Sequence, residues 1–312
     1  MKTLVVGATG VLGRRVVARL VAAGHEVTAP ARSEARATLL AELGASPVRV
    51  DVFDPAALRR VVAGHDVVAN LATHIPPTSK MAMPRAWAEN DRIRTEVSRH
   101  LVEAVLAENT VSGNTARYVQ ESIAFVYRDG GDRWLDESSP VDPVANLASA
   151  TVAEANAARV TAAGATGVIL RFAAFYGPDS DSTLDMIRLA RRRIALGAGP
   201  DRYVSSITTD DAAAAVVASF SAPAGVYNIG DDEPVTSRDY FAALAGALGV
   251  RPPLIAPVAL AKLGGPKASV LVRSQRVSNG AFVEATGWKP EYRSVREGWP
   301  MVLAAITAQG AT

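Results

Sequence analysis

The sequence predicts an α/β protein built on a doubly wound parallel sheet, with a smaller lobe at its C-terminal end. Short apolar runs alternate with amphipathic runs through about the first 175 residues, as strands and helices do in a parallel sheet with right-handed crossovers. A glycine-rich turn joins the first strand to the first helix. From about Gly177 the alternation fades, and proline, glycine and short segments dominate.

Expected strands are short apolar or β-branched runs, and expected helices are amphipathic runs that begin at a capping residue or a proline. The strands of the sheet are expected at residues 4–6, 25–30, 47–50, 66–72, 116–121 and 167–172, with single short strands at 203–207 and 226–229. The helices are expected at residues 11–23, 33–43, 55–63 and 145–163, with Ser33 as the cap of the second, and residues 83–108 are expected to contain a long helix.

The glycine turn is the feature around which the N-terminal half is organised. Gly7, Gly10 and Gly13 follow the first strand at the spacing G-x-x-G-x-x-G, directly before a helix. The order strand, glycine turn, helix brings free backbone N–H groups and a helix N-terminus together, and this geometry binds a pyrophosphate. Gly7 permits the tight turn, Gly10 the close approach of the phosphates, and Gly13 the packing of helix on strand. The alternative is a tight strand–helix turn without a ligand.

The predicted dinucleotide site at this turn is lined by Gly7, Thr9, Gly10, Val11, Leu12 and Gly13. We therefore expect residues 1–176 to form a Rossmann-type dinucleotide-binding domain. Residues 177–312 are expected to form a smaller substrate-binding lobe, with segments that return to the main sheet.

Composition excludes several functional classes. The chain has 312 residues, 49% hydrophobic and 21% charged, which is ordinary for a globular protein. A net charge of +2 argues against a nucleic-acid partner. No apolar run reaches membrane-spanning length, and the absence of cysteine excludes disulfides and thiolate catalysis. The first strand leaves no room for a signal or transit peptide. We expect a cytoplasmic monomer or homodimer that binds a small-molecule substrate.

Further motifs span nearly the whole chain: Asp51-Val52, Asn70-Leu71-Ala72-Thr73, Leu170-Arg171-Phe172 with Tyr176-Gly177-Pro178, Thr209-Asp210-Asp211-Ala212, and Thr286-Gly287-Trp288-Lys289-Pro290. With the glycine turn, they resemble an extended short-chain dehydrogenase/reductase of the NAD(P)-dependent epimerase/dehydratase type. The resemblance implies that Asp51 and Val52 flank the adenine. It also implies that Leu71, Ala72 and Thr73 pass the ribose and phosphates. The alternatives are a loop or helix-capping carboxylate for Asp51, and core packing for the strand end at Leu71.

The end of the second strand indicates which dinucleotide is preferred. An NAD site offers a carboxylate there to the ribose 2′-hydroxyl, but residues 29–33 contain none. Arg32 is placed to pair with a 2′-phosphate, and Ser33 can donate a hydrogen bond to it. The sequence therefore predicts NADP as the cofactor, with NAD second. An exposed surface cation is the alternative for Arg32.

The family's usual catalytic pair is missing. The resemblance implies a serine, which matches Ser122, and a Y-x-x-x-K pair in which lysine lowers the tyrosine pKa. If Glu154 is the glutamate that follows that lysine by four positions, Asn146 stands at the tyrosine position and Ala150 at the lysine position. No tyrosine or lysine occurs from residue 141 to residue 166. The usual tyrosine-based proton transfer is therefore not expected.

Other side chains could replace the pair. His74 follows the fourth strand and is suited to proton exchange near neutral pH, although a loop histidine bonded to backbone is equally consistent. Tyr176 lies where the family lines the nicotinamide and substrate, or packs in the core. Asn146 and Ser122 could orient a substrate carbonyl.

Three functions follow from these residues. The first is an NADP-dependent reductase or epimerase that acts on a small carbonyl or hydroxyl compound with an atypical proton donor. The second is a binding protein that senses NADP(H) without turnover. The third is a non-redox isomerase, cyclase or dehydratase on the same scaffold.

Overall fold

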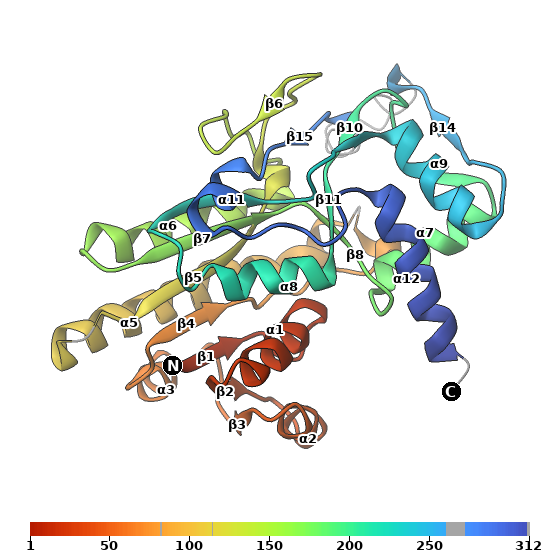
Figure 1. Cartoon of the computed structure of the whole chain (residues 1–312). Coiled ribbons are helices and arrows are strands. Elements are labelled where there is room, and N and C mark those ends of the chain that lie inside the picture. The colour runs from red at the N-terminus through yellow and green to blue at the C-terminus, as the bar shows by residue number, and fades with distance from the viewer. Residues whose placement is uncertain (82, 114, 260–271, 311–312) are drawn as a thin grey trace.

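A seven-stranded parallel sheet lies at the centre of the structure, a computed structural model that describes residues 1–81, 83–113, 115–259 and 272–310 (Figure 1). The strand order is β12-β7-β5-β4-β1-β2-β3, and every neighbouring pair is parallel. The strands are β1 (Lys2–Val6), β2 (Glu26–Pro30), β3 (Ser46–Val48), β4 (Val67–Asn70), β5 (Arg117–Ile123), β7 (Gly167–Phe172) and β12 (Gly225–Ile229).

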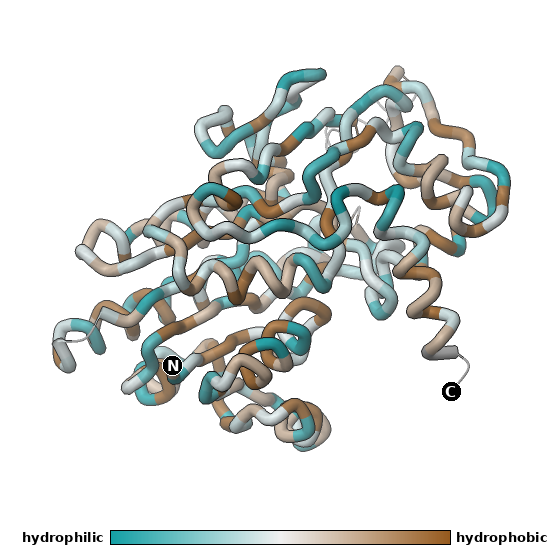
Figure 2. The backbone as a smooth tube through the Cα atoms, in the orientation of Figure 1, coloured by the Kyte–Doolittle hydropathy of each residue, from teal (hydrophilic) through white to brown (hydrophobic). Residues whose placement is uncertain are grey.

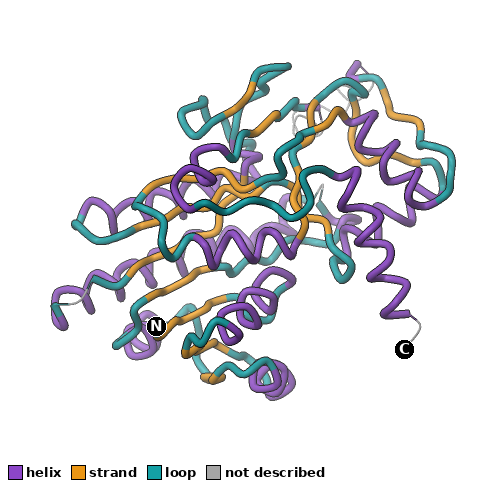
Figure 3. The backbone as a smooth tube through the Cα atoms, viewed as in Figure 1, coloured by secondary structure: helices purple, strands orange, loops and turns teal. Residues whose placement is uncertain are grey.

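Helices cover both faces of this sheet, because alternate strand side chains point to opposite faces. In β1, Val5 packs in a core with helices α1, α2, α8 and α11, whereas Leu4 and Val6 pack in a second core with α3, α5 and α6. The helices are α1 (Val11–Ala22), α2 (Glu34–Glu42), α3 (Pro55–Val62), α4 (Ala88–Arg92), α5 (Ser98–Ser112), α6 (Ala148–Ala162), α8 (Thr209–Ala218) and α11 (Gly280–Thr286). Figure 3 shows the alternation of strands and helices along the chain.

The chain reverses its direction of travel across the sheet at β1. It proceeds outward from β1 to β2 and β3, then returns to place β4 on the other side of β1. This arrangement makes the carboxyl ends of β1 and β4 a topological switch point, where open α/β sheets bind their ligands. The glycine turn follows β1 at this point.

A smaller lobe is built from segments of the C-terminal half around its own core. Tyr176, Tyr240 and Trp299 are buried in that core with apolar side chains of the lobe helices, which lie together at the right of Figure 1. The elements of the lobe and of the loops beside it are β6 (Trp134–Leu135), β8 (Ala174–Tyr176), α7 (Asp181–Arg191), β9 (Ile194–Ala198), β10 (Tyr203–Val204), β11 (Ser206–Thr208), β13 (Val235–Thr236), α9 (Ser237–Leu248), β14 (Leu254–Ala256), β15 (Arg276–Val277) and α12 (Val295–Gly310). The loop around β6 is largely hydrophilic (Figure 2).

The chain returns from the lobe to the main sheet, where β12 pairs with β7 along the edge. The boundary at residues 176 and 177 stays a prediction. Among the described residues, no helix is both long and apolar enough to cross a membrane.

Three local expectations differ from the structure. The stretch 83–108, expected to contain a long helix, holds a 3₁₀ turn (Pro84–Trp87), α4, a π-helical turn (Ile93–Val97) and most of α5. The single strand expected at 203–207 is two strands, β10 and β11, which pair with different partners. Ser33 stands at the N-cap of α2, but its side chain makes no capping hydrogen bond.

Candidate functional site

The glycine turn after β1 has no space for side chains at two of its positions. Gly7 has a φ of +86°, and a Cβ there would lie 2.6 Å from the backbone nitrogen of Ala72. A Cβ on Gly13 would overlap the carbonyl oxygen of Gly7, so helix and strand meet at backbone contact. At Gly10, whose N–H donates to the Gly7 carbonyl at 3.0 Å, a Cβ would meet only that carbonyl oxygen, at 3.3 Å. Gly10 therefore faces open space, as a phosphate cradle requires.

The start of α1 is suited to an anion. Gly10 is its N-cap residue, no side chain caps the helix, and the first turn contains no acidic residue. The first N–H groups of the helix are therefore left for an external acceptor, and the helix dipole favours a negative one. Thr9 and Val11 are partly exposed beside the turn, whereas Leu12 is buried in the core. The residues present fit the pyrophosphate of a dinucleotide.

The end of β4 runs beside this turn. The Leu71 N–H continues the ladder by donating to Val6 O at 2.9 Å, and the Leu71 side chain is buried in the core. Ala72 lies against Gly7, and Thr73 is exposed. The structure thus brings residues 71–73 together with the glycine turn, and Leu71 also packs in the core.

Asp51 and Val52 lie in the loop before α3. The Asp51 carboxylate accepts a hydrogen bond from Phe53 N at 2.9 Å and is exposed to solvent. Val52 is partly buried against the core below the sheet. Asp51 therefore shapes its own loop, and its second carboxylate oxygen accepts no hydrogen bond from the residues that the structure describes.

Two predicted site residues meet at a carboxylate that the sequence did not suggest. Glu89 of α4 lies between Arg32 and His74, with its Oε1 3.9 Å from Arg32 Nη1 and its Oε2 3.6 Å from His74 Nε2. All three side chains are about half exposed, and Ser33 beside Arg32 is exposed as well. A cation, an imidazole and a carboxylate thus converge near the ends of β2 and β4.

Ser122 belongs instead to a buried polar network. Its hydroxyl donates to Glu154 Oε1 at 2.6 Å, and both oxygens of Glu154 accept hydrogen bonds from Arg171, at 2.8 and 2.7 Å. Arg171 also donates to the Tyr127 hydroxyl at 2.9 Å, which donates to Asn228 Oδ1 at 2.8 Å. The Ser122 proton is directed into this network, and no described interaction joins Ser122 to His74.

The remaining predicted residues occupy different surroundings. Asn146 is partly exposed in a 3₁₀ turn (Ala145–Leu147) before α6, and Ala150 is fully buried on that helix. Tyr176 is fully buried, with its ring centroid 5.0 Å from that of Trp299. Burial raises the pKa of the Tyr176 phenol well above its usual range, and the Asp231 carboxylate raises it further. The structure therefore places Tyr176 in the packing of the lobe.

A second buried ion pair adjoins Ser122. Glu121, its neighbour in β5, accepts a hydrogen bond from Arg94 Nη2 at 2.7 Å, and Arg94 is 1% exposed. Arg94 stands in the π-helical turn, and its Nε and Nη1 atoms have no hydrogen-bond partner among the described residues. Neither residue belongs to a sequence motif, so this pair could not be predicted from the sequence, although π-helical turns are frequent at functional sites.

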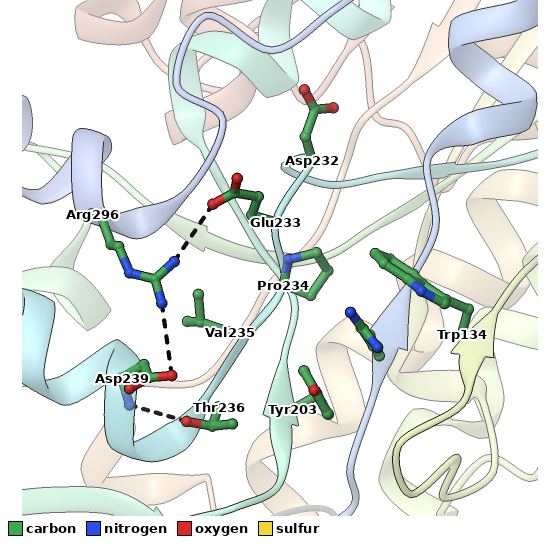
Figure 4. Close-up of a pocket in the computed structure, with 10 residues that line it drawn as sticks. Trp134, Tyr203, Asp232, Glu233, Pro234, Val235, Thr236, Asp239 and Arg296 are labelled. Atoms are coloured by element: carbon green, nitrogen blue, oxygen red, sulfur yellow. Dashed lines mark hydrogen bonds and ion pairs between the residues drawn. The ribbon is translucent and has the colours of Figure 1, made fainter.

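A polar pocket of about 290 Å³ opens on the side of the lobe. Arg276 stacks on two aromatic rings there, 4.2 Å from the Trp134 centroid and 4.7 Å from that of Tyr203. On the other wall, Arg296 faces Glu233 and Asp239, at 3.5 and 3.7 Å (Figure 4). None of the residues that the sequence predicted for the site lines this pocket.

Comparison with known proteins decides the family. The model of the NAD dependent epimerase/dehydratase family matches residues 3–230. The chain belongs to this family. The chain is also 34% identical over 310 residues to a 3-diazoavenalumate denitrifying reductase from a Streptomyces species, which covers 96% of this chain and 99% of the relative. A 2-alkyl-3-oxoalkanoate reductase from Shewanella oneidensis is 27% identical over 270 residues, or 80% of this chain and 66% of the relative.

Solved structures of family members share the fold over the whole chain. A UDP-glucose 4-epimerase from Thermotoga maritima matches with a TM-score of 0.79 at 19% identity, covering 100% of both chains. A human epimerase family protein solved with NADPH matches with a TM-score of 0.73 at 19% identity, covering 97% of this chain and 99% of that one. The expected doubly wound α/β fold and the expected family are both confirmed.

Proposed function

We propose that this protein is an NADP(H)-dependent reductase that acts on a small carbonyl compound. The observation that carries the proposal is the glycine turn, where Gly7 and Gly13 have no space for a Cβ and Gly10 faces open space beside an uncapped helix. Its full-length relative at 34% identity is named a reductase, and a fold neighbour was solved with NADPH. Arg32 supports NADP over NAD, because its cationic side chain follows β2, is 62% exposed and so is open to a 2′-phosphate.

When bound, NADPH would supply the hydride, and residues of this chain would hold it and provide a proton. Gly7, Gly10 and the start of α1 would hold the pyrophosphate. Arg32, with Ser33 beside it, would hold the 2′-phosphate. Asp51 and Val52 would flank the adenine, and residues 71–73 would line the ribose and phosphates.

We propose His74 as the proton donor. Its side chain is 46% exposed and so can exchange protons with water and substrate. The other candidates are less available: the Ser122 proton is bonded to Glu154, and Tyr176 is fully buried. Asn146, partly exposed at the start of α6, would orient a substrate carbonyl.

The test is NADPH consumption by the purified protein with a panel of small ketones and aldehydes. We expect turnover in the parent, and loss of both turnover and dinucleotide binding in Gly10→Val. In His74→Ala, the rate should fall by about 100-fold or more while the affinity for NADP stays unchanged. His65→Ala, in the turn that follows α3, is the matched control and should keep the parental rate. An active parent whose rate is unaffected by His74→Ala would show that another group donates the proton.

A second candidate is a binding protein that senses NADP(H) without turnover. It is favoured by the absence of tyrosine and lysine from residues 141–166, where the resemblance implies the titratable pair, and by the commitment of the Ser122 proton to a buried network. This candidate predicts NADPH binding without consumption against every substrate in the panel. A parent that consumes NADPH with any of them rules it out.

A further inference from the structure

We propose that Glu89 sets how strongly the site distinguishes NADP from NAD, by competing with a ribose 2′-phosphate for the Arg32 guanidinium. The inference rests on the proposed function, because it assumes that a nicotinamide dinucleotide binds at the glycine turn. It adds Glu89 to the residues proposed for the cofactor site. Glu89 lies on α4, far from Arg32 in the sequence, and belongs to no sequence motif.

The geometry places Glu89 beside Arg32, the residue proposed to hold the 2′-phosphate. Its Oε1 lies 3.9 Å from Arg32 Nη1, and among the described residues no other carboxylate forms an ion pair with Arg32. The Glu89 side chain is 49% exposed and that of Arg32 62% exposed. Both groups are therefore open to a ligand that approaches the end of β2.

The backbone of Glu89 is held in this position by its neighbours. Asn90, which is fully buried, accepts a hydrogen bond from His74 N through its Oδ1 at 3.0 Å. Trp87, 6% exposed, donates from its indole nitrogen to Met81 O at 2.9 Å. The start of α4 is thereby fixed to the loop after β4. The backbone at Glu89 is thus held beside Arg32.

The carboxylate acts in opposite directions on the two cofactors. A 2′-phosphate carries nearly two negative charges, so Glu89 repels it and also occupies the guanidinium that would bind it. A ribose 2′-hydroxyl is neutral and can donate a hydrogen bond to a carboxylate, as acidic residues accept one in NAD sites. Glu89 therefore lowers the preference for NADP that Arg32 creates.

Titration calorimetry of NADP and of NAD into the parent, Glu89→Gln and Glu96→Gln tests the inference. Glu96 is the matched control because it is a partly exposed glutamate two turns further along the same helical run, paired with Arg92 at 3.0 Å. We expect Glu89→Gln to raise the ratio of NADP to NAD affinity about twofold to fivefold, the range for one exposed ion pair. Glu96→Gln should leave the ratio at the parental value.

The Arg32→Ala background separates competition from other effects. If Glu89 acts by competing for Arg32, the Glu89→Gln substitution should raise the ratio of NADP to NAD affinity less in the Arg32→Ala background than in the parent. A folded Glu89→Gln variant with an unchanged or lower ratio overturns the inference and leaves the proposed function intact. A parent that binds neither dinucleotide overturns the proposed function itself.

Discussion

The Glu154→Gln substitution removes one charge from the network behind Ser122 and keeps the shape of the side chain. The Glu154 and Arg171 side chains are only 10% and 8% exposed, and a guanidinium keeps its proton throughout the accessible pH range. The variant therefore leaves a buried positive charge without its counter-charge. We expect a large loss of stability from a change of one atom.

The magnitude follows from the contacts at the carboxylate. Arg171 donates two hydrogen bonds to it, at 2.8 and 2.7 Å, and Ser122 a third, at 2.6 Å. In glutamine, one acceptor oxygen becomes an NH₂ group, which would face these donors with its own hydrogens. Breaking a buried ion pair by removing one partner costs about 3–5 kcal/mol. We expect the free energy of unfolding to fall by that amount.

Urea unfolding monitored by circular dichroism measures this loss. The control is Glu96→Gln, the same substitution in an exposed pair, where Arg92 and Glu96 are 54% and 40% exposed. Such pairs contribute about 0–1 kcal/mol, so the control should unfold at nearly the parental urea concentration. Equal small losses in the two variants would refute the argument that the charge pair holds the network.

Two further predictions concern the turn and the lobe. Gly13→Ala should destabilise the protein by about 1–3 kcal/mol through overpacking, whereas Gly10→Ala should unfold like the parent. Thermal unfolding of both variants tests this difference, and equal melting temperatures for the two variants would contradict it. Burial raises the pKa of the Asp231 carboxyl well above its usual value, and the charges of Asp232 and Glu233 add to the shift. The folded state therefore favours the protonated form, so the free energy of unfolding falls as pH rises from about 4. Asp231→Asn should remove this decline in the free energy of unfolding, measured with urea between about pH 4 and pH 8. If the free energies of variant and parent differ by the same amount at every pH, the prediction is contradicted.

Local pattern was sufficient for most of the fold. The strand at residues 167–172 was predicted with the bounds that β7 has, because a run of buried apolar residues between turn signals has few alternatives. The roles of Gly7 and Gly13 followed from spacing, since a G-x-x-G-x-x-G turn between strand and helix requires close backbone approach. Irregular helical turns were less predictable. The stretch 83–108 contains a 3₁₀ turn and a π-helical turn, and the spacing of side chains through such turns still resembles that of an α-helix.

Contacts between distant segments could not be predicted. Glu89 reaches Arg32 because α4 docks on the loop after β4, and an exposed glutamate on a short helix has no sequence signature. Tyr176 packs on Trp299, which lies near the end of the chain, so its burial depends on tertiary structure. Ser122 was assigned from the family resemblance, but the partner of its proton depends on where α6 places Glu154.

Calorimetric titration of the unmodified protein with NADP, and separately with NAD, tests the central claim most directly. The glycine turn and Arg32 predict that both dinucleotides bind at one site per chain and that NADP binds more tightly. Absence of binding by either dinucleotide, or tighter binding of NAD than of NADP, would contradict the proposed NADP site.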